Sequence, residues 1–267
     1  MTRLITEWIS DMEQTAADWD ESLRRRAGLG YKELAARVSG CGMEALSQAA
    51  DAYKVAVVPV TSGLGTIDTF SESVAAIVRA MGFEAFVTEA TDVNGIYEAC
   101  RRGADILYMA DDDRYIALNL RNGKVGDNDI ATARGYAEVL FQMAGSLKGE
   151  DAAVLGYGII GPLMAQALME KGAQVWIYDK DPAKRELAEA DGCRWIETPE
   201  ELSKFRFIGD ATSEGAWIHK GMLHPEVRMA APGIPFSMDE EMQRQLDGQY
   251  IHDLLEIGTA VMLGLAI

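Results

Sequence analysis

The sequence predicts an α/β protein, with a doubly wound parallel sheet in its C-terminal part and a second α/β unit, prefaced by helices, before it. Three observations support this fold class. From residue 54 onward, short apolar runs alternate with stretches of helical length, which is typical of parallel β-α units. One of these runs is followed by three glycines at the spacing of a nucleotide-binding turn. Six apolar runs after residue 150 are enough for a complete doubly wound domain.

The glycine turn is the most informative motif. Gly156 permits a tight turn, Gly158 lets backbone approach a pyrophosphate, and Gly161 lets the helix pack closely on the strand. A second strand ends at Asp179, 23 residues after Gly156, where a carboxylate accepts hydrogen bonds from an adenosine ribose. Strand, triplet, helix, strand and acid together predict a bound dinucleotide in a Rossmann domain. The loop expected to contact it includes Tyr157, Ile159 and Ile160.

Asp179 also indicates which dinucleotide binds. A carboxylate at this position repels a 2′-phosphate, so NAD is favoured over NADP. Lys180 and Arg185 lie nearby in the sequence and weaken the inference, although both also fit solvated positions at a helix start.

Length and composition set the outer limits. A chain of 267 residues holds two domains, which we expect at residues 1–147 and 148–267 with a cleft between them for cofactor and substrate. The net charge of −17 argues against nucleic acid and anionic membrane as partners. No run approaches ~20 apolar residues, and three scattered cysteines fit free thiols in a reducing cytoplasm. The apolar stripe of residues 2–27, with Trp8 and Trp19, predicts a homodimer.

The N-terminal part reads as helices followed by β-α units. We expect helices at 2–27, 32–38 and 43–52, strands at 54–60, 84–88 and 105–109, and helices at 71–81 and 94–102. Ligands in parallel sheets gather at the carboxyl ends of the strands. Polar residues stand there after two of these strands and at the start of the helix after the first: Ser62, Thr69, Ser71, Glu72, Asp111 and Asp112. They predict a site for ammonium groups, and the alternative is that they are helix caps and solvated loops.

The C-terminal part continues with a long helix at 130–147, capped by Asn128 or Asp129, and then six strands. Thr198 and Ser237 each begin a predicted capping box. Loops after the later strands are expected to cross the nicotinamide half of the cofactor. Together with two positions near the end of the sequence, they complete the predicted cofactor contacts: Thr212, Pro232, Gly233, Glu256 and Gly258.

The sequence shows no nucleophile elbow, no metal-binding cluster and no evident lysine base. His219, His224 and His252 are isolated and read as surface or core residues. The catalytic proton acceptor is therefore not identified. This pattern suits hydride transfer, in which the cofactor supplies the chemistry and the protein supplies positioning.

Several runs resemble the pyrrolysine synthase family. They are Val58–Gly63, Phe70–Ser73, Met109–Asp112, Asn119–Leu120, Asn122–Lys124, the glycine turn, Pro232–Pro235 and Ile257–Ala260, and the resemblance covers residues 54–267. It implies an NAD-dependent dehydrogenase that oxidises the terminal amine of lysine acylated by 3-methyl-D-ornithine. Hydrolysis then releases ammonia, and the ornithine α-amine closes the pyrroline ring. The resemblance also implies that Thr69, Ser71, Glu72 and Asp112 orient the substrate.

Two other functions remain open from the residues alone. One is a different NAD(P)-dependent amine dehydrogenase or a methylenetetrahydrofolate dehydrogenase, although the latter needs a lysine base that the strand-end loops lack. The other is a non-catalytic NAD sensor, whose first domain would bind a partner in place of a small molecule.

Overall fold

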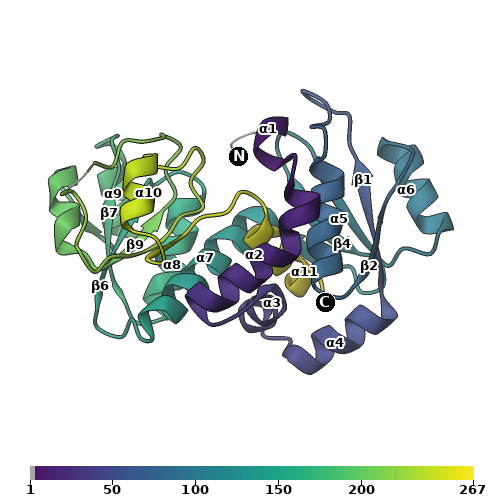
Figure 1. Cartoon of the computed structure of the whole chain (residues 1–267), viewed down its shortest axis with the longest axis horizontal. Coiled ribbons are helices and arrows are strands. Elements are labelled where there is room, and N and C mark those ends of the chain that lie inside the picture. Colours follow the sequence, from purple (N-terminus) through teal and green to yellow (C-terminus); the bar gives the residue numbers. More distant parts are fainter. Residues whose placement is uncertain (1–3, 220) are drawn as a thin grey trace. The chain divides into compact units, whose positions relative to one another are not determined.

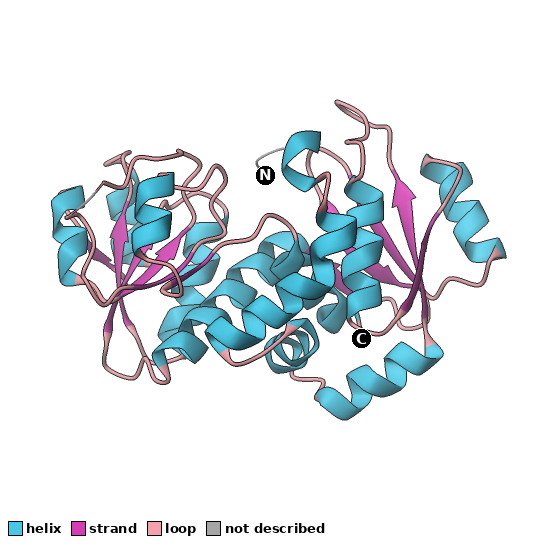
Figure 2. Ribbon diagram, in the orientation of Figure 1, coloured by secondary structure: helices cyan, strands magenta, loops and turns pink. Residues whose placement is uncertain are grey.

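The computed structural model describes residues 4–219 and 221–267 and divides the chain into two compact units. The first unit comprises the chain up to Arg25, Leu29–Thr132 and Leu254–Ile267. The second comprises Arg26–Gly28 and Ala133–Asp253. Both are sheets covered by helices (Figures 1 and 2), so the predicted α/β class is confirmed.

The first unit holds a five-stranded sheet in the order β2-β1-β3-β4-β5. β1, β2 and β3 are parallel, close to the predicted bounds, whereas β4 and β5 are antiparallel and were not predicted. Helices α5 and α6, on opposite faces of the sheet in Figure 1, follow β1 and β2. The strands are β1 Lys54–Pro59, β2 Glu84–Val87, β3 Ile106–Ala110, β4 Tyr115–Asn119 and β5 Val125–Asp127.

The first unit also contains seven of the helices described. The single helix expected at 2–27 is two helices, because the chain turns at Asp11, whose carbonyl accepts from Gln14 and Thr15 at the start of α2. The helices are α1 Thr6–Ile9, α2 Met12–Ala27, α3 Tyr31–Ser39, α4 Met43–Ala52, α5 Phe70–Ala80, α6 Asp92–Arg101 and α11 Glu256–Ala266.

Helix α11 is buried on almost every side, in keeping with its apolar sequence. It packs against α3, α5, β4 and β5. Gly264 lets its backbone approach that of Ala35 in α3. Two buried tyrosines of the sheet bond to its first turn: Tyr108 donates to the Thr259 carbonyl, and Tyr115 bonds the Thr259 hydroxyl, both at 2.8 Å. The helix therefore forms the centre of the first unit.

The second unit holds a six-stranded, fully parallel sheet in the order β11-β10-β9-β6-β7-β8, which confirms the predicted Rossmann domain. The long helix α7, Asn128–Ala144, contributes its residues from Ala133 onward. The strands are β6 Asp151–Leu155, β7 Gln174–Tyr178, β8 Arg194–Trp195, β9 Phe207–Asp210, β10 Arg228–Ala230 and β11 Tyr250–Ile251. The remaining helices are α8 Ile160–Glu170, α9 Lys184–Ala190, the 3₁₀ helix η1 Pro199–Lys204 and α10 Glu240–Gln245.

Helix caps show where local patterns succeed and fail. Thr198 and Glu201 form the predicted capping box at η1. The box expected at Ser237 is wrong, because Asp239 caps α10 and accepts from Met242 N–H at 2.8 Å. The expected cap of α7 at Asn128 or Asp129 is also wrong. Asp127 caps this helix by accepting from the N–H groups of residues 129 and 130.

The two units differ from the expected ranges 1–147 and 148–267 in three places. α7 groups with the second unit from Ala133 onward, residues 254–267 group with the first, and Arg26–Gly28 group with the second. The second difference follows from packing, since α11 buries its surface against helices and strands of the first unit. The cleft between domains stays a prediction. Among the described residues, no helix has the length and apolar character needed to span a bilayer.

Candidate functional site

The carboxyl edge of the first sheet carries the predicted substrate residues. β1 and β3 are neighbouring parallel strands, with Pro59 beside Ala110, so the loops that follow them start side by side. We call residues 60–69, between β1 and α5, the β1 loop. It is joined to the loop after β3 by Asp112, whose carboxylate accepts from Leu64 N–H at 2.6 Å. Gly63 leaves the space that this carboxylate occupies.

Thr69 ends the β1 loop in a conformation that is unusual for its residue type. Its φ of 68° lies in the left-handed region that favours glycine. Its carbonyl accepts from both N–H and hydroxyl of Ser73, but its own Oγ1 is buried without a hydrogen-bond partner in the described part of the chain. A buried hydroxyl without a partner, next to strained backbone, is characteristic of sites that bind ligands.

Glu72 and Ser71 lie in the first turn of α5, directly after Thr69. Glu72 is exposed and makes no hydrogen bond or ion pair with described residues. Its carboxylate does not cap α5, because it accepts from no N–H group of the described residues. Glu72 is thus available to a ligand at the same sheet edge as Asp112.

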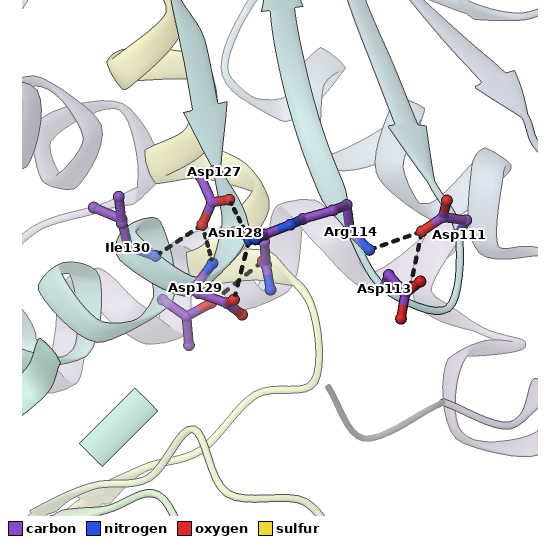
Figure 3. Close-up of polar contacts among 8 residues, drawn as sticks. Asp111, Asp113, Arg114, Asp127, Asn128, Asp129 and Ile130 are labelled. Atoms are coloured by element: carbon purple, nitrogen blue, oxygen red, sulfur yellow. Dashed lines mark hydrogen bonds and ion pairs between the residues drawn. The ribbon is translucent and has the colours of Figure 1, made fainter. Parts of the chain in front are cut away.

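The loop after β3 is organised by Asp111 (Figure 3). Its Oδ1 accepts from the N–H groups of Asp113 at 2.9 Å and Arg114 at 2.7 Å, and these bonds lower the pKa of Asp111. Asp111 therefore shapes the turn that presents Asp112. Its Oδ1 is occupied by these two hydrogen bonds.

Arg114 links this loop to the start of α7, as Figure 3 shows. Its guanidinium lies 3.2 Å from the carboxylate of Asp127 and 3.8 Å from that of Asp129. Burial and the neighbouring charge of Asp127 raise the pKa of Asp129. Arg114 is thus shared by two carboxylates, which leaves its charge outweighed at this edge.

In the second unit, the glycine turn has the geometry that its sequence predicted. Gly156 has φ of 82°, and a Cβ on Gly161 would overlap the carbonyl oxygen of Gly156. A Cβ on Gly158 would meet nothing within 4 Å. Open space at the middle glycine is what a backbone that receives a pyrophosphate requires, so these residues fit a dinucleotide.

Asp179 lies next to this turn. Its carboxylate accepts from the N–H of Tyr157 at 2.6 Å and from that of Asp181 at 2.8 Å. Tyr157 contributes backbone to the loop, while its side chain is buried and its hydroxyl donates to Asp191 at 2.8 Å. In contrast, Ile159 is 60% exposed, and Ile160 begins α8.

The loops after β9 and β10 meet the glycine turn. The backbone of Gly156 approaches that of Ala211 and Thr212, and Gly233 packs on the backbone of Thr212. The structure therefore brings Thr212, Pro232 and Gly233 to the same sheet edge as the glycine turn. Glu256 and Gly258 are placed differently, because both are buried in the first turn of α11 and belong to the first unit.

Asp210 is a buried acid at this edge that the sequence did not single out. Its Oδ1 accepts from the Thr212 N–H at 3.0 Å and hydroxyl at 2.7 Å, which fixes the start of the loop. Its Oδ2 and the Ser237 hydroxyl oxygen are both buried, and neither makes a hydrogen bond of normal length and angle with the described residues. Burial raises the pKa of Asp210. An apolar strand followed by an acid gives no sign of this burial, because acids after strands are usually exposed.

The histidines match the expectation of isolated residues. His252 stacks on Phe236, with ring centroids 4.2 Å apart, and burial lowers its pKa. His224 accepts from Glu226 N–H within a local turn, and His219 is exposed. Within residues 4–219 and 221–267, no group of three histidine, cysteine or acidic side chains is arranged to hold a metal ion.

Comparison with known proteins gives a consistent result. Residues 11–126 match the family model described as "Pyrrolysine biosynthesis protein PylD, N-terminal domain", and residues 151–208 match the NAD binding domain of 6-phosphogluconate dehydrogenase. The pyrrolysine synthase of Methanosarcina acetivorans is 35% identical over 264 residues, which is 98% of each chain. That of Methanosarcina barkeri is 39% identical over 210 residues, covering 79% of this chain and 80% of the relative.

Solved structures share the fold at low sequence identity. Shikimate dehydrogenase from Aquifex aeolicus superposes with a TM-score of 0.52 and 13% identity, over 80% of this chain and 90% of that one. Quinate dehydrogenase from Corynebacterium glutamicum gives a TM-score of 0.50 and 12% identity, over 79% and 90%. Both similarities concern the arrangement of elements only.

Proposed function

Because the chain belongs to the pyrrolysine synthase family, we propose that it is an NAD-dependent amine dehydrogenase that completes pyrrolysine. Its substrate is lysine whose side-chain nitrogen is acylated by 3-methyl-D-ornithine. The terminal CH–NH₂ group loses a hydride and a proton, water releases ammonia from the resulting imine, and the α-amine condenses with the aldehyde to form the ring. NAD, when bound, accepts the hydride.

The observation that carries this proposal is the pair of carboxylates at one sheet edge. Glu72 and Asp112 follow the neighbouring parallel strands β1 and β3. The substrate carries several ammonium groups, and a carboxylate is their natural partner. With Arg114 already paired, an incoming ammonium group meets a surface of negative charge. Glu72 and Asp112 would bind such groups and hold the amine in one orientation.

The hydroxyls of the β1 loop and α5 would complete the substrate contacts. Thr69 Oγ1 has a buried position and lacks a partner among the described residues, so a substrate carboxylate or amide would satisfy it. Ser62 and Ser71 lie on either side of it in sequence, at the loop and in the first turn of α5. Asp111 would act mainly by shaping the turn that carries Asp112.

The cofactor contacts are proposed for the glycine turn and its neighbours. Gly158 would receive the pyrophosphate, and Asp179 would bind the ribose hydroxyls. Thr212, Pro232 and Gly233 would line the nicotinamide end. Glu256 and Gly258 lie in α11, which belongs to the first unit. If they contact the cofactor, the contact comes from the first unit and not from the Rossmann domain.

Two substitutions test the substrate site. Glu72→Gln and Asp112→Asn each keep the shape of the side chain and remove its charge. In the second variant, the amide oxygen of the new side chain can still accept from Leu64 N–H. Losing a charge-assisted contact should lower kcat/KM by roughly 10- to 150-fold, measured as NADH formation with the lysine–methylornithine conjugate. Cofactor affinity should not change.

The matched control is Glu89→Gln, which removes an exposed carboxylate after the edge strand β2 of the same sheet. Its effect on kcat/KM should stay within about twofold. Normal turnover in both site variants would show that the carboxylates are only solvated residues of the loops. A loss of NAD binding in either variant would point to misfolding and remove the support for a separate substrate site.

A further inference from the structure

Asp92, in the first unit, makes contacts that neither the resemblance nor the sequence pattern predicts. It is the first residue of α6, and its backbone φ of 55° lies in the left-handed region. Its carboxylate does not cap its own helix. Instead it bonds to Thr61 in the β1 loop, 31 residues earlier in the sequence.

We propose that Asp92 is a positioning residue that holds the β1 loop in the shape that binds the substrate. This inference rests on the proposed function, because it takes the β1 loop to be part of the substrate site.

The bonds from Asp92 fix the backbone N–H and the hydroxyl of Thr61, near the start of the β1 loop. Oδ1 accepts from the Thr61 N–H at 2.8 Å, and Oδ2 accepts from the Thr61 hydroxyl at 2.6 Å. A third bond, from the Thr91 hydroxyl to Oδ2 at 3.0 Å, restrains the carboxylate itself. The Thr61 bonds lower the pKa of Asp92, so it stays ionised at neutral pH.

The position of Asp92 in the sheet explains its effect on the loop. In the order β2-β1-β3, the central strand is β1. Asp92 lies beyond β2 and Asp112 lies beyond β3, so the β1 loop is held from both sides by carboxylates. Asp92 bonds to Thr61 and Asp112 bonds to Leu64. The segment between these two anchors contains Ser62 and Gly63.

Backbone strain indicates that the carboxylate is needed for more than folding. The left-handed conformation is unfavourable for an L residue, less so for aspartate than for threonine, and not for glycine. Within the described residues, the non-glycine residues with positive φ are Thr69, Asp92 and Ala216, and the first two belong to the sheet edge of the first unit. Such strain is typically kept where a side chain has a functional task.

Asp92→Gly separates positioning from stability. The change removes all three side-chain bonds, while glycine relieves the strain at φ 55° and offsets part of their loss, so the melting temperature should change by only a few degrees. The β1 loop loses one anchor, and the KM for the substrate should increase roughly tenfold or more, with a smaller change in kcat. The Kd for NAD should not change, because the glycine turn belongs to the other unit.

Two further variants make the result specific. Glu98→Ala is the matched control on the same helix: it removes a carboxylate that accepts from Glu89 and Ala90 N–H and pairs with Arg102, but does not touch the β1 loop. It should lower the melting temperature and leave KM unchanged. Thr61→Val should raise KM, and adding it to Asp92→Gly should cause little further increase, because both changes break the same contact.

Hydrogen exchange gives a readout that does not depend on turnover. In Asp92→Gly the amide of Thr61 should exchange faster, since its acceptor is gone. An unchanged KM in Asp92→Gly, when Glu72→Gln raises it, would overturn the role of Asp92 alone. An unchanged KM in both would overturn the proposed substrate site as well. A lower melting temperature with lower kcat and constant KM would also overturn the inference, since it would indicate partial unfolding.

Discussion

Lys180 lies beside the carboxylate that is proposed to select the cofactor, and its charge is already paired. Its ammonium group is 2.7 Å from Glu214 in the loop after β9. Arg185, the other cation near Asp179 in sequence, pairs with Glu189 and Glu197. These pairs are exposed and individually weak. They nevertheless place carboxylates around both cations, and we expect these carboxylates to disfavour the extra phosphate of NADP.

We therefore predict that NAD binds more tightly than NADP and that two substitutions reduce this difference in affinity. Asp179→Ala removes the repelling carboxylate, and Glu214→Gln frees Lys180 for a 2′-phosphate. Each should improve the NADP-to-NAD affinity ratio by roughly 3- to 10-fold, a modest factor because water screens charges at an exposed site. Fluorescence titration with both cofactors measures the ratio. NADP binding to the unaltered protein at least as tightly as NAD would disprove the ribose role of Asp179.

At the same scale, the sequence predicted residues whose role depends on local pattern. The three glycines and Asp179 follow one another at fixed spacing, and the structure gives each glycine the surroundings expected of it. Asp92 and Asp210 could not be found this way. The partner of Asp92 is Thr61, which lies 31 residues earlier in the sequence. The burial of Asp210 depends on other segments covering the end of its strand.

At the scale of elements, the turn between β6 and α8 allows a direct comparison of two glycines. Gly158→Ala introduces a Cβ into open space, so it should not affect stability, but it should raise the Kd for NAD by roughly tenfold or more by blocking the pyrophosphate. Gly161→Ala forces α8 away from the Gly156 carbonyl and should lower stability by about 1–3 kcal/mol. Thermal unfolding and NAD titration of both variants distinguish the two effects. Equal effects of the two changes on stability would contradict this division of roles.

Strand prediction failed where strands are short and half polar. β4, Tyr115–Asn119, buries alternate residues only, and β5 spans three residues, Val125–Asp127. A parallel β-α rhythm gives no signal for such an antiparallel pair. It forms because α11 covers it, with the backbone of Gly126 packed on the carbonyl of Met262. That contact joins segments more than a hundred residues apart, so no local pattern records it.

At the scale of the whole molecule, the buried acid Asp210 should influence how stability depends on pH. Burial raises its pKa in the folded state above the usual 3.8, so the folded protein binds a proton more tightly than the unfolded chain does. Its contribution to stability is therefore greatest at low pH and is lost as the pH rises from about 3.8 through the raised value.

Asp210→Asn removes this titration and keeps an oxygen that accepts from Thr212. We predict that the variant is more stable than the unaltered protein at pH 7, by ~1–3 kcal/mol. The difference should shrink toward pH 4. Thermal unfolding without cofactor, followed across this pH range, measures both effects. A variant that is less stable at pH 7 would show that the buried charge is satisfied in the folded state.

The predicted homodimer also belongs to this scale, and it stays a prediction. Trp8 and Trp19 keep about a third of their surface exposed, at 36% and 37%, with Ile5 at 44% nearby in the sequence. The predicted homodimer interface consists of these exposed apolar side chains. The two-unit organisation, by contrast, followed from the sequence because each sheet has its own strand rhythm.

The membership of α11 in the first unit has a consequence for biosynthesis. The sheet of this unit leaves the ribosome early, but the helix that covers β4 and β5 follows only after residues 133–253. At ~5–20 residues per second, translation of that stretch takes on the order of ten seconds. Throughout this time the nascent first sheet lacks its central helix, and by its end all strands of the Rossmann sheet have been made. The part of the protein that is synthesised first is therefore the part that finishes folding last.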